Sequence, residues 1–307
     1  MSLRNDLRHI FDLGGLTVRE LARRVIREMG EDEVSGYAAQ LAYYFLFALF
    51  PFFIFLTALL GFIPIPDLLD RIMEVLIDFI PVGAAEIVED NVYALVSQER
   101  GGLLSFGILL ALWSASGAVA AITESLNRAY GVREGRPFWK ARGTAILLTV
   151  GLAAMIILSM VLLVVGPGLI GPLADMIGLG PVFKTLWLVL RWPIVLTMMI
   201  LAIAVVFYLA PDVEQQWRWI TPGAIFAVLM WLAVSALFGF YVENFAEYNK
   251  TYGSIGAVIV LLMWMYLSGL SLLIGGEINS EIEHAAPGGK DEGEKKIPHR
   301  RLRRARA

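Results

Sequence analysis

Six long apolar blocks constrain the fold of this chain more than any other feature. Each holds about 20 or more mostly uncharged residues, which is enough for one helix to cross a hydrocarbon core of about 30 Å. Lipid offers no hydrogen bonds to the backbone, so such segments are expected to be helices rather than strands. The blocks cover approximately residues 37–63, 103–129, 144–170, 183–210, 220–242 and 254–277. The sequence therefore predicts an all-α polytopic membrane protein with six transmembrane helices.

The composition agrees with a membrane protein. Hydrophobic residues make up 58% of the chain and charged residues 17%, whereas soluble domains average about 45–50% and about 25%. The chain has no cysteine, which excludes disulfides and thiolate metal sites. Pro51 and Pro193 lie inside two of the apolar blocks, and each is expected to bend its helix because proline removes a backbone hydrogen bond.

Positive charge indicates the orientation. Lysine and arginine gather in the N-terminal segment, between the second and third blocks, and in the C-terminal tail, while the alternate connections hold few. Connections rich in these residues stay on the cytoplasmic side of a membrane. Both termini are therefore predicted to be cytoplasmic, which agrees with an even number of spans. The first 36 residues are charged throughout, so we expect no cleavable signal peptide.

The same pattern divides the chain into three parts. We expect a cytoplasmic amphipathic segment over 1–36, a transmembrane domain over 37–283 and a disordered basic tail over 284–307. Within the first part, Thr17 and Glu20 form a capping-box pattern that opens a basic amphipathic helix over 17–29. That helix is suited either to an anionic membrane surface or to packing against the bundle.

The longest external connection is also amphipathic. Residues 67–98 contain two acidic segments with apolar faces, separated by a proline–glycine break. We expect a helical hairpin on the external side between the first and second transmembrane helices. It either covers an outward-facing cavity or rests on the membrane interface.

Ionisable and amide side chains inside the predicted spans are candidates for function, because burying them in lipid is costly. Glu124 and Arg128 have the i,i+4 spacing of a helical ion pair. We expect a polar cluster at the cytoplasmic ends of the helices, serving either structural pairing or transport chemistry. Its members are Gln40, Glu124, Arg128, Asp212 and Glu277, and Asn279 is a further candidate beside Glu277 on the same side.

Arg191 is a candidate in the outer half of the bundle. It lies about two turns into its predicted helix from the external side. It is expected to extend toward the interface, to pair with Glu243 or Glu247, or to bind a phosphate or carboxylate headgroup.

Motifs for several enzyme classes are absent from the sequence. The three histidines lie in the terminal regions, and the chain contains no zinc-protease, Walker A or nucleophile-elbow motif. We therefore expect no enzyme, no metal or other cofactor and no nucleic-acid partner.

Several segments in order resemble the YihY/BrkB family of membrane proteins, also called UPF0761. They are residues 36–51, 113–116, 126–130, 211–224, 248–256 and 264–279, and within them the family-motif positions are Pro51, Gly223, Tyr252, Gly253 and Gly256. Gly253 and Gly256 fit a tight turn or close helix packing. The resemblance implies a six-helix, multi-pass protein of the bacterial inner membrane. It also implies links to virulence, serum resistance and suspected envelope lipid transport.

Two functions follow as hypotheses. The first is a transporter or flippase of a lipid or another amphiphilic envelope component. The alternative is a non-catalytic scaffold for envelope assembly, which would use the basic termini and the acidic hairpin. The ribonuclease label that some family members carry has no support in these residues. The expected partners are membrane lipids, anionic ones among them, and either a second copy of the chain or an envelope-assembly protein.

Overall fold

The structure, a computed structural model, describes residues 13–60, 101–164, 180–245 and 248–296, and over these residues it contains helices and no strands. The helices are α2 (Val18–Glu31), α3 (Val34–Leu60), α6 (Gly101–Ala129), α7 (Phe138–Val164), α9 (Gly180–Leu209), α10 (Trp217–Phe245) and α11 (Tyr248–Ala285). Each predicted apolar block overlaps one of the six helices from α3 to α11. The all-α fold is therefore confirmed.

Within the described residues, four helices are long and apolar enough to cross a membrane. These stretches are Phe138–Leu163, Thr185–Leu209, Trp219–Val242 and Gly256–Ala285, and Val34–Leu49 is a shorter apolar stretch. Leucine, isoleucine, valine and phenylalanine side chains on α7, α9 and α10 are exposed. Lipid tails solvate such a surface and water does not. Six spans and the orientation remain predictions.

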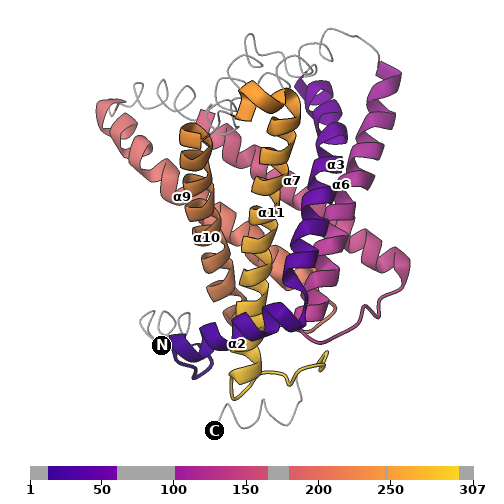
Figure 1. The fold of residues 1–307 in the computed structure, drawn as a ribbon, viewed down its shortest axis with the longest axis vertical. Helices are drawn as coiled ribbons and strands as arrows, with labels where there is room; N and C mark the ends of the chain where they lie inside the picture. The colour runs from indigo at the N-terminus through magenta and orange to yellow at the C-terminus, as the bar shows by residue number, and fades with distance from the viewer. Residues whose placement is uncertain (1–12, 61–100, 165–179, 246–247, 297–307) are drawn as a thin grey trace.

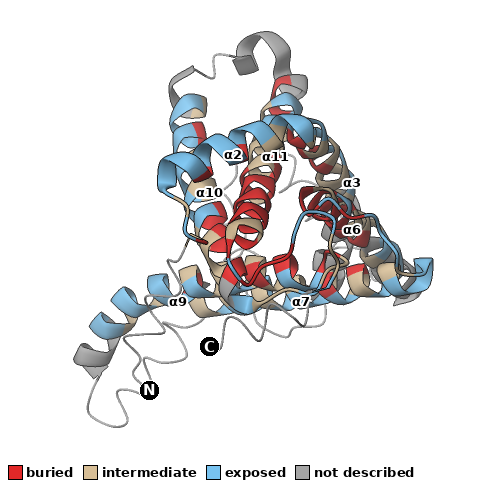
Figure 2. Ribbon diagram, turned by 90° about the horizontal axis from the view of Figure 1, so that it is seen from below, coloured by how far each residue is buried: buried red, intermediate tan, exposed pale blue. Residues whose placement is uncertain are grey.

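Helix α11 lies at the centre of the bundle. It contacts α10, α3, α2 and α6, and α3 pairs with α6. Helices α7 and α9 contact each other and lie along one side, as Figure 2 shows. Helix α2 lies across one end of the bundle, beside the C-terminal end of α11 (Figure 1). We call this end the α2 end.

Most of the described core lies toward the α2 end. Leu41 on α3, Leu126 on α6 and Phe207 on α9 belong to one buried cluster. Ile220 on α10 and Leu273 on α11 complete its centre. Leu148 on α7 belongs to the same cluster, so six helices pack together at this end and give polar groups nearby a fixed frame.

Helices α10 and α11 approach each other at a pair of glycines. A Cβ atom added to Gly223 would lie 2.1 Å from the Gly275 carbonyl oxygen, and one added to Gly275 would lie 2.6 Å from the Gly223 carbonyl oxygen. The Gly223 amide also donates a hydrogen bond to Asn279 Oδ1 over 2.8 Å. Small residues at a crossing allow such backbone contact. Gly223, a family-motif position, is therefore required for close packing.

Helix α2 begins with the predicted capping box. The Glu20 amide donates to Thr17 Oγ1 over 3.3 Å, and the Thr17 amide donates to a Glu20 carboxylate oxygen over 3.0 Å. Leu21 and Val25 are buried against isoleucines of α11. Of the two predicted environments for this helix, packing against the bundle is therefore the observed one, and its arginines remain on the exposed side.

Helix α11 is longer than the predicted span of 254–277. It begins at Tyr248 and continues to Ala285, passing through Tyr252, Gly253 and Gly256 without a break. The prediction of a tight turn at these two glycines is therefore wrong. Hydropathy detects only the part of a helix that matches the hydrocarbon core, and this helix continues beyond that part at both ends.

The tail expected to be disordered is folded over its described part. Lys290 is fully buried, pairs with Glu283 over 2.7 Å and donates to the Glu214 carbonyl oxygen. The Gly293 amide donates to the Tyr130 carbonyl oxygen over 3.2 Å. The tail is polar in sequence, but the ends of α6, α10 and α11 offer it partners. The prediction of disorder is therefore wrong for the part of the tail that ends at residue 296.

Some predictions concern residues outside the described ranges, and others are not tested by the contacts of the described residues. The external hairpin 67–98, Glu247 and residues 297–307 lie outside the described residues. Pro193 lies inside the continuous helix α9. Pro51 likewise belongs to α3. The boundaries of the three parts of the chain also remain predictions.

Candidate functional site

A cavity of about 430 Å³ lies between α3, α6 and α7. The aromatic residues Tyr43, Tyr44 and Trp113 contribute to its lining. The Tyr43 and Tyr44 rings pack edge to face at 5.8 Å. The charged residues Glu124 and Arg142 line the same cavity. Gln40 also lines the cavity, so the structure brings two of the predicted site residues, Gln40 and Glu124, to one place.

A second cavity, of about 670 Å³, shares Ala120, Glu124 and Arg142 with the first. Its lining is more charged. The charged residues are Asp32, Glu124, Arg128, Arg133, Glu134 and Arg142. Because two ionisable residues line both spaces, the cavities adjoin and form a groove. The lining changes from charged near the α2 end to aromatic deeper along α3 and α6.

Arg142 was not among the residues predicted for the site, although it lines both cavities. It lies about one turn into α7, where its Nη2 donates to the Trp113 carbonyl oxygen over 2.6 Å. Its guanidinium stacks over the Trp113 ring at 4.0 Å. Its Nε is buried and has no hydrogen-bond partner. The signal in the sequence was an arginine at the start of an apolar block, four residues after Phe138.

The predicted ion pair between Glu124 and Arg128 is wrong. Arg128 instead lies 3.6 Å from Asp32 and 3.9 Å from Glu33, and its Nη2 donates to the Glu31 carbonyl oxygen over 3.4 Å. The connection between α2 and α3 brings these groups across the end of α6. Among the described residues, the Glu124 carboxylate has no hydrogen bond or ion pair within bonding distance.

Asp32 has an unusual acidity. Burial raises its pKa to about 6, although Arg128 acts in the opposite direction. Glu28 and Glu292 raise the pKa further through repulsion. Burial disfavours a charged carboxylate, and here that effect outweighs one partly exposed arginine.

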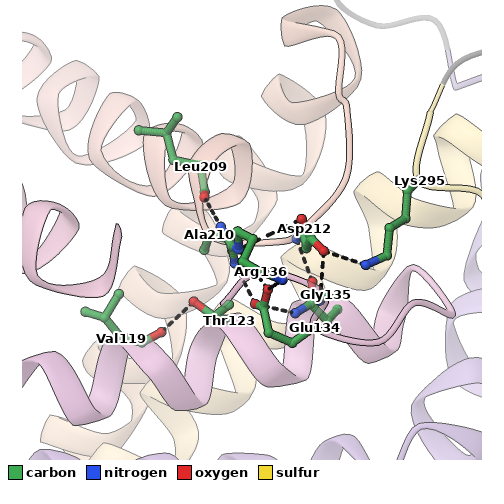
Figure 3. Close-up of polar contacts among 10 residues, drawn as sticks. Val119, Thr123, Glu134, Gly135, Arg136, Leu209, Ala210, Asp212 and Lys295 are labelled. Atoms are coloured by element: carbon green, nitrogen blue, oxygen red, sulfur yellow. Dashed lines mark hydrogen bonds and ion pairs between the residues drawn. The ribbon is translucent and has the colours of Figure 1, made fainter. Parts of the chain in front are cut away.

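Asp212 belongs to a separate polar cluster at the α2 end (Figure 3). It lies 2.5 Å from Lys295 and 3.9 Å from Arg136, and it accepts a hydrogen bond from the Gly135 amide over 3.0 Å. Hydrogen bonds from Arg136 hold the pKa of Glu134 below its ordinary value. These contacts join the α6–α7 connection to the α9–α10 turn and to the tail. Asp212 therefore serves a structural joint beside the groove.

Glu277 and Asn279 are buried in α11 and do not line the groove. Their exposed fractions are 2% and 1%. Asn279 supports the contact with Gly223 described above. The predicted convergence of five polar residues is thus only partly realised: Gln40, Glu124 and Arg128 line the groove, whereas Asp212 and Glu277 lie elsewhere.

Arg191 also lies away from the groove. It is roughly 27 Å from the end of α9 at Leu209, counted at about 1.5 Å per residue. Its guanidinium lies 5.4 Å from the Trp192 ring centre, and its Nε is buried without a partner. The side chains of Glu243 and Glu247, its predicted partners, lie outside the described part of the structure. That pairing stays a prediction.

The described residues contain no group of three or more histidines, aspartates and glutamates able to hold a metal ion. Together, the apolar helices and the amphiphilic groove are those of an α-helical membrane protein. The family model for the virulence factor BrkB matches residues 25–299. The chain belongs to this BrkB family, also called UPF0761.

Several relatives are similar along most of the chain. The putative ribonuclease-like protein YfkH of Bacillus subtilis (strain 168) is 39% identical over 264 residues, covering 86% of this chain and 94% of that protein. A UPF0761 membrane protein of Pseudomonas aeruginosa (strain LESB58) is 25% identical over 83% of this chain, which spans 61% of that protein's length. One from Tolumonas auensis is 24% identical over 83% of each chain. No solved structure matches the chain.

Proposed function

We propose that this protein moves an amphiphilic envelope lipid between membrane leaflets, with the α2 end facing the cytoplasm of a bacterial inner membrane that the chain crosses six times. The observation that supports this proposal is the graded lining of the groove between α3, α6 and α7. Charged residues at one end suit a headgroup, and the aromatic residues Tyr43, Phe47 and Trp113 suit the glycerol and acyl region.

The groove also meets a lipid-facing surface. Tyr43 is 54% exposed, Phe47 53% and Trp113 52%. A lipid in the membrane reaches the polar residues past these rings without first entering water. A path along which a headgroup stays in contact with polar groups lowers the barrier to crossing, because an unsolvated charge in hydrocarbon is costly.

Catalysis is not part of the proposal. The described residues contain no group of histidines and carboxylates able to hold a metal ion, and the proposal assigns the charged groups of the groove to contact with a headgroup. The proposal therefore does not extend the ribonuclease-like name of the Bacillus subtilis relative to this chain.

Filling the groove tests the proposal. Gly117 lines the groove, and a Cβ atom at this position would lie 3.7 Å from the Tyr44 ring. Gly117→Leu is expected to slow lipid movement by about tenfold or more, because the larger side chain would occupy space in the groove that the lipid needs. Gly117→Ala reaches only ordinary contact distance and is expected to stay close to wild type.

The measurement uses vesicles that contain the purified full chain and a fluorescent phospholipid. A membrane-impermeant reductant quenches only label that reaches the outer leaflet. Gly151→Leu is the matched control, because Gly151 is exposed on α7 with nothing near its Cβ position. Equal rates for Gly117→Leu and Gly151→Leu, or no movement with the wild type, would overturn the proposal and favour a scaffold.

A further inference from the structure

The groove contains one acidic and one basic side chain that do not pair with each other. Glu124 on α6 and Arg142 on α7 line both cavities. Among the described residues, the hydrogen bond and the ring contact of Arg142 are both with Trp113, Tyr44 also acts on Arg142 electrostatically, and Glu124 has no hydrogen bond or ion pair. Two opposite charges that share a cavity without an ion pair leave room for a third group between them.

Each of the two side chains has unused hydrogen-bonding capacity. A guanidinium carries five N–H donors, and the Nε of Arg142 is buried with no acceptor. A carboxylate accepts several hydrogen bonds, and Glu124 receives none from the described residues. Gln40 lines the same cavity and likewise has no hydrogen bond within the described part of the chain. The groove therefore offers donors and acceptors together.

The pair of charges restricts the ligand. An anionic headgroup would be attracted by Arg142 but repelled by Glu124. A purely cationic headgroup would be attracted by Glu124 but repelled by Arg142. A headgroup that carries a phosphodiester and an ammonium satisfies both. Arg142 suits the phosphate because its fork of donors matches the phosphate oxygens.

The ammonium must also carry N–H donors. The Glu124 carboxylate forms charge-assisted hydrogen bonds with a primary ammonium, whereas a trimethylated ammonium has no N–H to donate. The Tyr43 and Phe47 rings, whose centres lie 4.6 Å apart, add aromatic faces along the same cavity.

We infer that the space between Glu124 and Arg142 binds the headgroup of an amine-bearing zwitterionic phospholipid of the phosphoethanolamine type, an assignment that rests on the proposed function and names its substrate class. The Arg142 guanidinium binds the phosphodiester. The Glu124 carboxylate and the Gln40 amide oxygen accept hydrogen bonds from the ammonium. The apolar part of the lipid lies along the aromatic side of the groove.

The test measures headgroup preference by native mass spectrometry. Purified full-length chain in detergent is mixed with equal amounts of phosphatidylethanolamine, phosphatidylcholine and phosphatidylglycerol that share the same acyl chains. The wild type is expected to bind the ethanolamine lipid about tenfold more than either of the others, which is the scale of one charge-assisted hydrogen bond.

Two variants separate the roles of the charges. Glu124→Gln is expected to reduce the preference for the ethanolamine lipid over the glycerol lipid to within about twofold. Arg142→Gln is expected to weaken all three lipids alike, because all three carry the phosphodiester, and Arg142→Lys is expected to restore part of the binding. Glu31→Gln and Arg23→Gln change exposed charges outside the groove and serve as matched controls.

Three results would overturn the assignment: equal binding of the three lipids by the wild type, a preference for the glycerol lipid, or an unchanged preference in Glu124→Gln. Soluble phosphoethanolamine is added as a competitor to identify the source of the headgroup. If the free compound at equal concentration displaces the lipid, the site binds the free compound and the assignment to a lipid is refuted. If the lipid stays bound, the assignment to a lipid is supported. All variants are compared with the wild type by thermal unfolding, and Glu124→Gln with Arg142→Lys suffices if Arg142→Gln does not fold.

The vesicle experiment separates this inference from the proposed function. Headgroup preference that depends on Glu124, without any lipid movement, would support the headgroup site and refute transport. Lipid movement that is equal for all headgroups and insensitive to Glu124→Gln would support transport and refute the headgroup site.

Discussion

Asp32 shows how one residue at the α2 end reports on the balance between burial and charge pairing. Its pKa is about 6 in the folded protein, against 3.8 for an ordinary aspartate. Between these two values the folded state holds a proton that the unfolded state has lost. Stability therefore falls as pH rises through this range, because the unfolded state binds fewer protons.

We predict that Asp32→Asn removes this part of the pH dependence. The wild type is expected to lose thermal stability relative to Asp32→Asn as pH rises from about 4 to about 6, and the difference is expected to level off above that range. Thermal unfolding of both proteins in the same detergent at a series of pH values measures it. Parallel curves for the two proteins would show that Asp32 is not held neutral.

At this scale the sequence predicted part of the site. Gln40 and Glu124 were expected near the same helix ends, and both line the groove. Arg128 was assigned to Glu124 because spacing rules consider partners within one helix, whereas the structure brings Asp32 from the preceding connection. Arg142 counted only as a positive charge near a helix start. Its role depends on Trp113 of another helix, which one-dimensional patterns do not place.

Helix α2 is held by a narrow apolar face. Leu21 is 8% exposed and packs against isoleucines of α11, while Ile26 on the opposite side is 71% exposed. Leu21→Ala is expected to lower the free energy of unfolding by about 2–3 kcal/mol. Ile26→Ala is the matched control and is expected to change it by less than about 0.5 kcal/mol. Chemical denaturation in detergent micelles, followed by tryptophan fluorescence, provides the comparison; similar effects of both substitutions would refute the observed docking of α2.

For the helices, apolar length was a good guide to position and a poor guide to the ends. Each apolar block overlaps a helix because lipid-facing segments have few other ways to satisfy their backbone. Helix α11 nevertheless continues to Ala285, since Glu277, Glu281 and Glu283 find polar or buried surroundings at the α2 end that hydropathy does not represent. Capping at Thr17 was predictable because it depends on neighbours three residues apart.

Over the whole molecule, the described tail acts as a strap across the α2 end. Lys290 is buried against Glu283, and Lys295 pairs with Asp212 on the α9–α10 turn. Deleting residues 287–307 is expected to destabilise the protein by about 3 kcal/mol or more, the cost of removing one partner of a buried ion pair. Deleting only 297–307 leaves these contacts in place and is expected to leave the melting temperature unchanged.

Both truncated proteins are compared with the full chain by thermal unfolding in the same detergent. Equal melting temperatures for all three would refute the strap. Sequence composition predicted a free tail here, since it registers charge and glycine content and not the partners offered by the ends of α6, α10 and α11.

The contact between Gly223 and Gly275 also has a mechanical consequence. Where two backbones touch directly, no rotatable side chain lies between them to absorb a displacement, and a slide of one residue would drive a larger side chain into the opposite helix. Helices α10 and α11 are therefore expected to behave as a single stiff strut. Any change of shape that admits or releases a ligand then falls to α3, α6 and α7, whose contact at the groove passes through tyrosine, tryptophan and arginine side chains that can change rotamer.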